Sequence, residues 1–198
     1  MSQALLTSLV WTDYRLAVLF TVFIPLVLSI WCFVQRVDAI QRLCAIYWRV
    51  SSLLAITVYL MIGGFPFSFV TALLARILIP ISLWFWADLN EELEDMTRTP
   101  LKISFTSWRW AVSVYNILGA IALIPFLRCA FSAGEFGTGV CQTWVQAPLL
   151  YREYFHANLR PEFLGFALGL PTLVIYLLCL AYFVFVRLGK QGRSAIQQ

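Results

Sequence analysis

Long apolar stretches alternate with short polar segments along the chain and predict its architecture. Crossing the hydrocarbon core of a bilayer takes about 20 apolar residues in a helix. Five stretches approach that length: 16–34, 43–62, 72–88, 108–127 and 162–186. Four of them contain a proline, which membrane helices tolerate when neighbouring groups satisfy the freed carbonyls. We therefore expect an all-α, polytopic membrane protein with about five spans, forming one domain over residues 1–198 with a loop at 128–161.

The third stretch is the hardest to place because it contains Arg76. A charge at the centre of a bilayer costs at least about 2.5–3.5 kcal/mol. We therefore expect residues 66–71 to form an interfacial or re-entrant piece, and the helix to begin near Ala72, with Arg76 one turn inside the outer interface. No Asp or Glu lies at that depth in another expected span. The predicted partners of Arg76 are lipid phosphate, backbone carbonyls or Asn116, and snorkelling or a structural bond is favoured over a role in an ion pathway.

The distribution of basic residues predicts the orientation. With five spans, nine of the 14 Lys and Arg fall in segments on one side, and four fall on the other side. The positive-inside rule then places the N-terminus outside and the C-terminus inside. Tryptophans, which favour membrane interfaces, gather at the expected inner interface: Trp31, Trp48, Trp84, Trp86, Trp108 and Trp110.

Composition supports a membrane protein and excludes other classes. The chain is 61% hydrophobic and 12% charged, with a mean hydropathy of +0.82, whereas soluble domains have about 25% charged residues. The formal net charge is +4, and no basic run is dense enough for a nucleic-acid surface. We therefore expect membrane lipid and other membrane-protein subunits, or a homo-oligomer, as partners, and no nucleic acid.

Two of the five cysteines fall on the expected outer side. Cys129 and Cys141 flank a glycine-rich segment that can bend, and the outer compartment can be oxidising. A disulfide between them is predicted, and two unrelated thiols are the alternative, since sequence does not establish the geometry. No cysteine pair has the spacing of metal ligands.

A run of acidic residues follows the third stretch. The spacing of its carboxylates predicts one face of a helix that continues from that span: Asp88, Glu91, Glu92 and Asp95. A solvated extension, or a face matched to Arg98, Lys102 and the basic tail, is favoured, and docking to another protein is the next interpretation. The acidic residues are a weak candidate for a metal site, because the run faintly echoes a motif of Mg²⁺-dependent membrane prenyltransferases. The second acidic motif of those enzymes is absent, so no catalytic residue is assigned.

Two further features have structural and functional interpretations. His156, the single histidine, is a weak candidate ligand for haem or chlorophyll, and packing or hydrogen bonding is favoured. No cofactor is required by the sequence, although bound lipid or pigment is compatible with it. Gly165 and Gly169 form a Gly-x-x-x-Gly motif, which lets another helix approach closely, either inside the chain or on a partner.

Several segments resemble a known family along nearly the whole chain. They are WTDYRLAV at 11–18, WRVSSLLAITVYLMIG at 48–63, RILIPISLWFWADLNEE at 76–92, SWRWAVSVYNILGA at 107–120, IPFLRCAF at 124–131, YREYFHAN at 151–158 and YFVFVRLGKQGRSA at 182–195. These segments resemble cyanobacterial thylakoid integral membrane proteins of unknown function. The resemblance implies a photosynthetic membrane, with the N-terminus and the loop 128–161 on the lumenal side and the C-terminus in the cytosol. The plasma membrane is a further location, and the resemblance supplies no catalytic residues.

The sequence contains no set of residues with the types and spacing of a known catalytic site, so we expect a non-catalytic protein. The favoured function is an accessory subunit or assembly factor of a photosynthetic or other membrane complex. A small transporter or channel acting as an oligomer is the alternative, and it predicts a water-accessible cavity around Arg76 and Asn116. A metal-dependent lipid- or prenyl-processing enzyme using residues 88–95 is the less favoured alternative.

Overall fold

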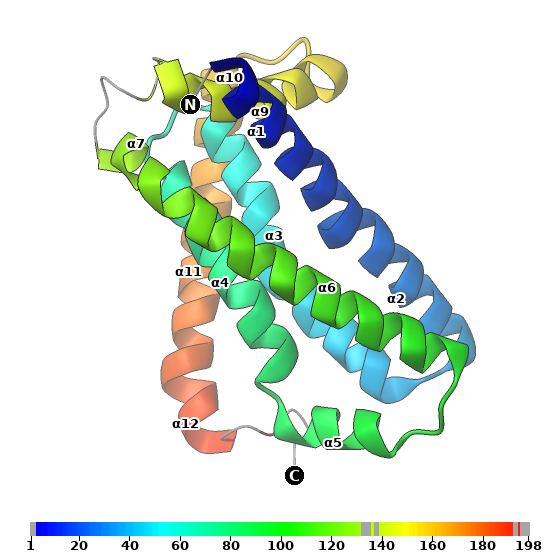
Figure 1. Ribbon diagram of the computed structural model, residues 1–198. Helices are drawn as coiled ribbons and strands as arrows, with labels where there is room; N and C mark the ends of the chain where they lie inside the picture. Colours follow the sequence, from blue (N-terminus) through cyan, green and yellow to red (C-terminus); the bar gives the residue numbers. More distant parts are fainter. Residues whose placement is uncertain (1–2, 132–135, 137–138, 192–193, 195–198) are drawn as a thin grey trace.

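The computed structural model describes residues 3–131, 136, 139–191 and 194, and every regular element within them is a helix (Figure 1). The elements are α1 (Gln3–Val18), η1 (Leu19–Phe23), α2 (Ile24–Gln35), α3 (Asp38–Ile62), α4 (Ser68–Trp84), α5 (Ala87–Asp95), α6 (Pro100–Leu123), η2 (Ile124–Leu127), α7 (Arg128–Phe131), α9 (Gly139–Phe155), α10 (Pro161–Leu164), η3 (Gly165–Gly169), α11 (Leu170–Tyr182), η4 (Phe183–Arg187) and α12 (Leu188–Gln191).

Consecutive elements join into rods long enough to cross a membrane. Four rods are apolar and continuous: Gln3–Gln35, Asp38–Ile62, Pro100–Phe131 and Pro161–Arg187. A fifth candidate is the pair α4 and α5, which is bent by 55°. The described chain therefore has four to five helices that can span a membrane, which confirms the expected all-α class. The rods run between two ends of the bundle, the "α9 end", where α1 begins and α9 lies, and the "α5 end", where α5 lies across the helices (Figure 1).

Three boundaries differ from those expected. The first helix begins at Gln3 rather than near residue 16, because a helix continues through polar residues that its own bonds and its neighbours can satisfy. Helix α4 begins at Ser68, so Arg76 lies two turns inside it and no re-entrant piece occupies residues 68–71. The loop at 128–161 was expected to carry a short helix, and it contains the 17-residue helix α9, which packs against α1 and α3.

Helix α3 is the centre of the bundle. It packs against α2, α4, α9 and α11, and its buried side chains include Ile40, Leu43, Tyr47 and Leu60. Outward-facing positions on the surrounding rods are apolar, as Phe33 and Phe185 illustrate with exposed fractions of 75% and 82%. Such surfaces suit a hydrocarbon environment, in which apolar side chains carry no cost of exposure.

The Gly-x-x-x-Gly motif is used inside the chain. A Cβ atom built on Gly165 falls 2.5 Å from the Cα of Gly63, and one built on Gly169 falls 3.1 Å from a methyl of Leu60. The absence of side chains at both positions lets the last membrane rod touch the end of α3. The sequence left open whether this motif packs inside the chain or on a partner, and this geometry is a contact inside the chain.

Pro25 has a visible effect on the first rod. Proline has no N–H, so carbonyls one turn earlier lose their helical donor. The chain opens into the π-helical segment η1 just before it, and two neighbouring helices supply replacement donors. Tyr47 donates to the carbonyl of Thr21 at 2.7 Å, and the Trp108 indole donates to the carbonyl of Phe20 at 2.9 Å. The proline therefore ties the first rod to α3 and α6.

Candidate functional site

An ion pair lies inside the bundle. Arg76 projects from the middle of α4, with a side chain only 9% exposed, and its Nη2 atom is 2.5 Å from Oδ2 of Asp13 on α1. Burying an isolated charge in an apolar medium is very costly, whereas a paired and hydrogen-bonded charge is tolerated. The pair explains how an arginine can occupy the middle of this helix.

Tyr115 on α6 completes the cluster. Its hydroxyl lies 2.9 Å from Oδ1 of Asp13 and donates to the carboxylate, while the guanidinium carbon of Arg76 lies 5.2 Å from the centre of the tyrosine ring. Gly119 lies one turn further along α6 and leaves space for the arginine, since a Cβ atom there would fall 1.7 Å from Nη1 of Arg76. We call Asp13, Arg76, Tyr115 and Gly119 the "arginine cluster". It joins α1, α4 and α6.

Arg76 makes a structural bond, as favoured, but with a partner that was not predicted, because Asp13 lies outside the charge-free stretch from which the first span was drawn. The charge-free stretch begins at Leu16, but the helix begins at Gln3, so Asp13 lies on a helical face that packs against the bundle. Extending the predicted helix to residues 3–18 would have identified Asp13 as a candidate partner of Arg76. Asn116 donates to the carbonyl of Val112 instead of pairing with Arg76. Its Oδ1 atom and Nη1 of Arg76 are buried without hydrogen-bond partners among the described residues.

At the opposite end, helix α5 displays the acidic run. It does not continue α4 as expected, because the chain bends by 55° between them. Leu89 and Leu93 on its inner face are fully or almost fully buried, whereas Glu91, Glu92, Glu94 and Asp95 are exposed. Asp88 is half-buried and accepts a hydrogen bond from Ser194 at 3.1 Å. We call Glu91, Glu92 and Asp95 the "acidic face" of α5.

A polar contact fixes the bend before α5. Asn90 donates to the carbonyls of Trp84 and Trp86, which lie on either side of the break, and its Oδ1 accepts a hydrogen bond from Arg109 on α6. The guanidinium of Arg109 also stacks 3.8 Å from the centre of the Trp84 ring. We call Asn90, Trp84 and Arg109 the "bend staple". It holds α4, α5 and α6 in one fixed arrangement.

A lysine holds the other end of α5. Lys102 Nζ donates to the carbonyls of Glu94 and Met96 at 2.8 and 2.6 Å. These carbonyls lie at the C-terminal end of the helix, where the backbone lacks intrahelical donors and a cation is favourable. Lys102 was expected to match the acidic side chains, but it binds backbone oxygens instead. Lys102 therefore does not neutralise the acidic face.

The remaining predicted site residues lie near the α9 end. His156 follows α9, and its Nε2 lies 3.1 Å from the hydroxyl of Tyr59 on α3. Cys129 and Cys141 form a disulfide with a Cα–Cα distance of 5.8 Å, which joins α7 to α9. The part of the chain that the structure describes contains no group of three or more His, Cys, Asp or Glu residues arranged to hold a metal ion. The acidic run therefore does not converge on one point.

Comparison with known proteins identifies a family. A family model described as a protein of unknown function, DUF3177, matches residues 7–196. This chain belongs to the DUF3177 family. No curated protein and no solved structure matches it. The family covers both the arginine cluster and α5, so the two features belong to one DUF3177 unit, and the cyanobacterial thylakoid origin stays a prediction.

Proposed function

We propose that this DUF3177 protein is an accessory subunit or assembly factor of a larger membrane complex, and that it docks through the acidic face of α5. The observation that carries the proposal is a helix held rigidly at both ends while its carboxylates point outward. The bend staple holds the start of α5, Lys102 holds its end, and Leu89 and Leu93 anchor its inner face. None of these anchors uses the acidic face.

The chemistry of this face favours a basic protein segment as the partner. Three carboxylates within nine residues repel one another and attract cationic groups. Anionic lipid headgroups would be repelled by the same charges. Lys and Arg on a partner helix or loop can pair with carboxylates, and such complementarity raises the rate and specificity of association more than the affinity.

The test compares charge reversal at the two ends of the bundle. Glu91→Lys with Asp95→Lys inverts the acidic face around position 92, and Glu153→Lys with Glu162→Lys inverts the same number of exposed carboxylates at the α9 end. A photo-crosslinking residue placed at Glu92 in native membranes identifies the contacting protein. We expect a discrete crosslinked partner whose yield falls at least about tenfold after reversal at α5, equivalent to 1.4 kcal/mol.

The control pair should leave that yield unchanged. No crosslink at Glu92, or an equal loss with both pairs, contradicts docking through α5. Fractionation of the host membranes tests the location that the resemblance implies, namely the thylakoid membrane of a cyanobacterium.

A second candidate function, transport by an oligomer, is favoured by one observation. Nη1 of Arg76 and Oδ1 of Asn116 are buried polar atoms without described partners, and such atoms are uncommon unless water or an ion meets them. Two cavities of the bundle are lined by other residues, one between α2 and α6 and one near Met61 and Leu149. Ion flux through proteoliposomes that is lost in Arg76→Gln and Asn116→Leu would favour this candidate over docking.

A further inference from the structure

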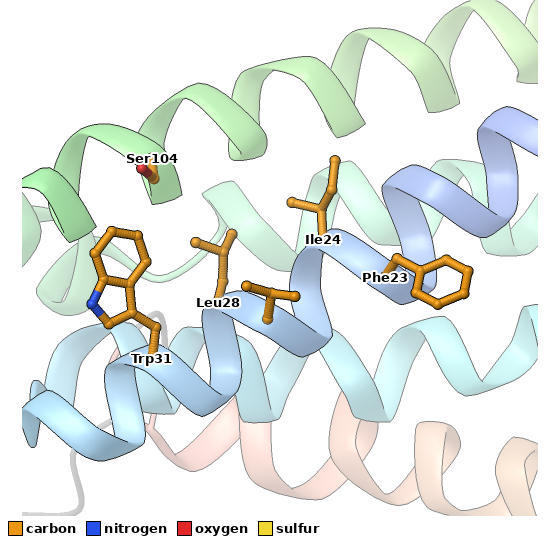
Figure 2. Close-up of a pocket in the computed structure, with 6 residues that line it drawn as sticks. Phe23, Ile24, Leu28, Trp31 and Ser104 are labelled. Atoms are coloured by element: carbon orange, nitrogen blue, oxygen red, sulfur yellow. The ribbon is translucent and has the colours of Figure 1, made fainter.

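An open apolar hollow lies between the first rod and α6. Ile24, Val27, Leu28 and Trp31 line it from α2, Phe23 from the end of η1, and Ser104 from α6 (Figure 2). Its volume is about 310 Å³. Phe23 and Val27 are 59% and 60% exposed, so the hollow opens on the outer surface of the bundle rather than into its interior. It belongs neither to the arginine cluster nor to the acidic face.

The hollow is a fixed feature because its walls are held from behind. The carbonyls of Phe20 and Thr21, just before the hollow, are bonded by Trp108 and Tyr47. Further along, the Trp48 indole donates to the hydroxyl of Ser29 at 2.9 Å. These bonds fix the first rod against α3 and α6, while the small side chain of Ser104 leaves space opposite Leu28 and Trp31 (Figure 2).

The length and depth of the hollow match one leaflet of a bilayer. Phe23 lies near the centre of the charge-free stretch 16–34, and Trp31 lies near its end. The eight residue steps from Phe23 to Trp31 rise about 12 Å along a helix. Half of a hydrocarbon core is about 15 Å. A single acyl chain, running from the interface towards the bilayer centre, has this length.

Two exposed arginines lie along the chain just beyond the helices that line the hollow. Arg36 follows α2, with a left-handed backbone (φ 53°), and its side chain is exposed. It comes five residues after Trp31, so it lies about one and a half turns beyond the hollow. Arg98, just before α6, is also exposed. A guanidinium at this level matches the phosphate of an anionic headgroup.

We propose that the hollow binds an anionic membrane lipid from the leaflet on the α5 side. One acyl chain lies along Phe23 to Trp31 against Ser104, and the phosphate headgroup lies at Arg36. The lipid fills a surface that the helices of this chain leave open, and its chemistry matches both ends of the hollow. This site is independent of the docking surface on α5.

Native mass spectrometry of the full chain, released from nanodiscs of equal parts phosphatidylglycerol and phosphatidylcholine, tests the proposal. The wild type should retain one phosphatidylglycerol. Ser104→Phe fills the hollow and should lower that retention about tenfold, equivalent to 1.4 kcal/mol. Ser107→Phe adds the same ring at an exposed position of α6 outside the hollow and should retain the lipid.

A second variant keeps the test decisive if Ser104→Phe fails to fold. Arg36→Gln leaves the hollow intact and should remove the preference for phosphatidylglycerol over phosphatidylcholine. The proposal is overturned if Ser104→Phe retains phosphatidylglycerol like the wild type, if the wild type retains both lipids equally, or if it retains neither. Retention of a pigment or quinone in place of the lipid also overturns it.

Discussion

The bundle buries two arginines, and their charges are met in different ways. Arg76 in the middle of α4 faces the carboxylate of Asp13, whereas Arg109 on α6 meets an amide and an indole ring. Both residues are almost fully buried, with exposed fractions of 7% and 4%. The first contact joins helices across the bundle with opposite charges. The second fixes a bend with neutral groups and an aromatic face.

The difference shows which contact depends on a matched pair. Removing one partner of a buried ion pair leaves the other charge unpaired, which is strongly destabilising. Arg109 has neutral groups as its direct contacts, and the carboxylate of Glu94 interacts with it only from beyond ion-pair distance. Removing this arginine therefore also removes much of the cost of burying its charge. The arginine cluster should therefore be fragile to single substitutions, and the bend staple should tolerate a neutral replacement.

Asp13→Asn should have the largest effect. It leaves the Arg76 guanidinium buried without a counter-ion and should lower the free energy of unfolding by about 3–5 kcal/mol. Chemical denaturation in a mild detergent, followed by circular dichroism, measures the change. Adding Arg76→Gln to the same chain should restore more than half of the loss, because no charge then remains buried. A loss below about 1 kcal/mol for Asp13→Asn would show that water already solvates the pair.

Reduction of the Cys129–Cys141 disulfide should come next. The bond closes a segment with a sequence separation of 12 between two short elements at the α9 end. On the chain-entropy model, opening it should cost about 2–3 kcal/mol. Unfolding with and without reductant gives the difference, and Cys179→Ser, at an exposed free cysteine, is the control for modification of other thiols. An equal response to reductant in Cys129→Ser with Cys141→Ser would contradict this assignment.

Gly119→Ala tests the space reserved for Arg76. The new methyl would fall on Nη1 of the guanidinium and push it away from Asp13, so we expect a loss of about 1–3 kcal/mol. Gly189→Ala is the matched control, because nothing lies within 4 Å of a Cβ atom there. The effect of Gly119→Ala should depend on the ion pair. Gly119→Ala should therefore cost much less in a chain that already carries Asp13→Asn and Arg76→Gln. Simple additivity would mean that Gly119 acts elsewhere.

Sequence patterns predicted the class of fold because apolar length is a strong signal for spans. The all-α architecture follows directly from stretches such as 162–186, which corresponds to the rod Pro161–Arg187. The break between α4 and α5 was missed, because the helical spacing of Asp88 to Asp95 continues the preceding pattern without a visible stop. The bend depends on Asn90, and its contact with Arg109 joins residues 19 apart in sequence.

The arginine cluster shows a second reason for incomplete prediction. Asp13 and Arg76 are separated by 63 residues, and only packing between α1 and α4 brings them together. Periodicity identifies the face of one helix, but it carries no information on which faces meet. Arg76 was identifiable because a charge inside an apolar stretch is costly wherever it lies. Its partner Asp13 was missed because the first span was started where the charge-free stretch begins, whereas the helix itself begins earlier.

Arg109 provides the sharpest test of the comparison, although its expected effects are the smallest. Arg109→Gln removes the stacking on Trp84 and the bond to Asn90, but it also removes a buried charge, so unfolding should become easier by only about 1 kcal/mol. Arg109→Lys keeps the charge while losing the planar stack, so it should cost more than Arg109→Gln. Amide hydrogen exchange over α5 should accelerate in both variants, since both release Asn90. If Lys is better tolerated than Gln, a counter-charge meets Arg109, and the distinction between the two arginines fails.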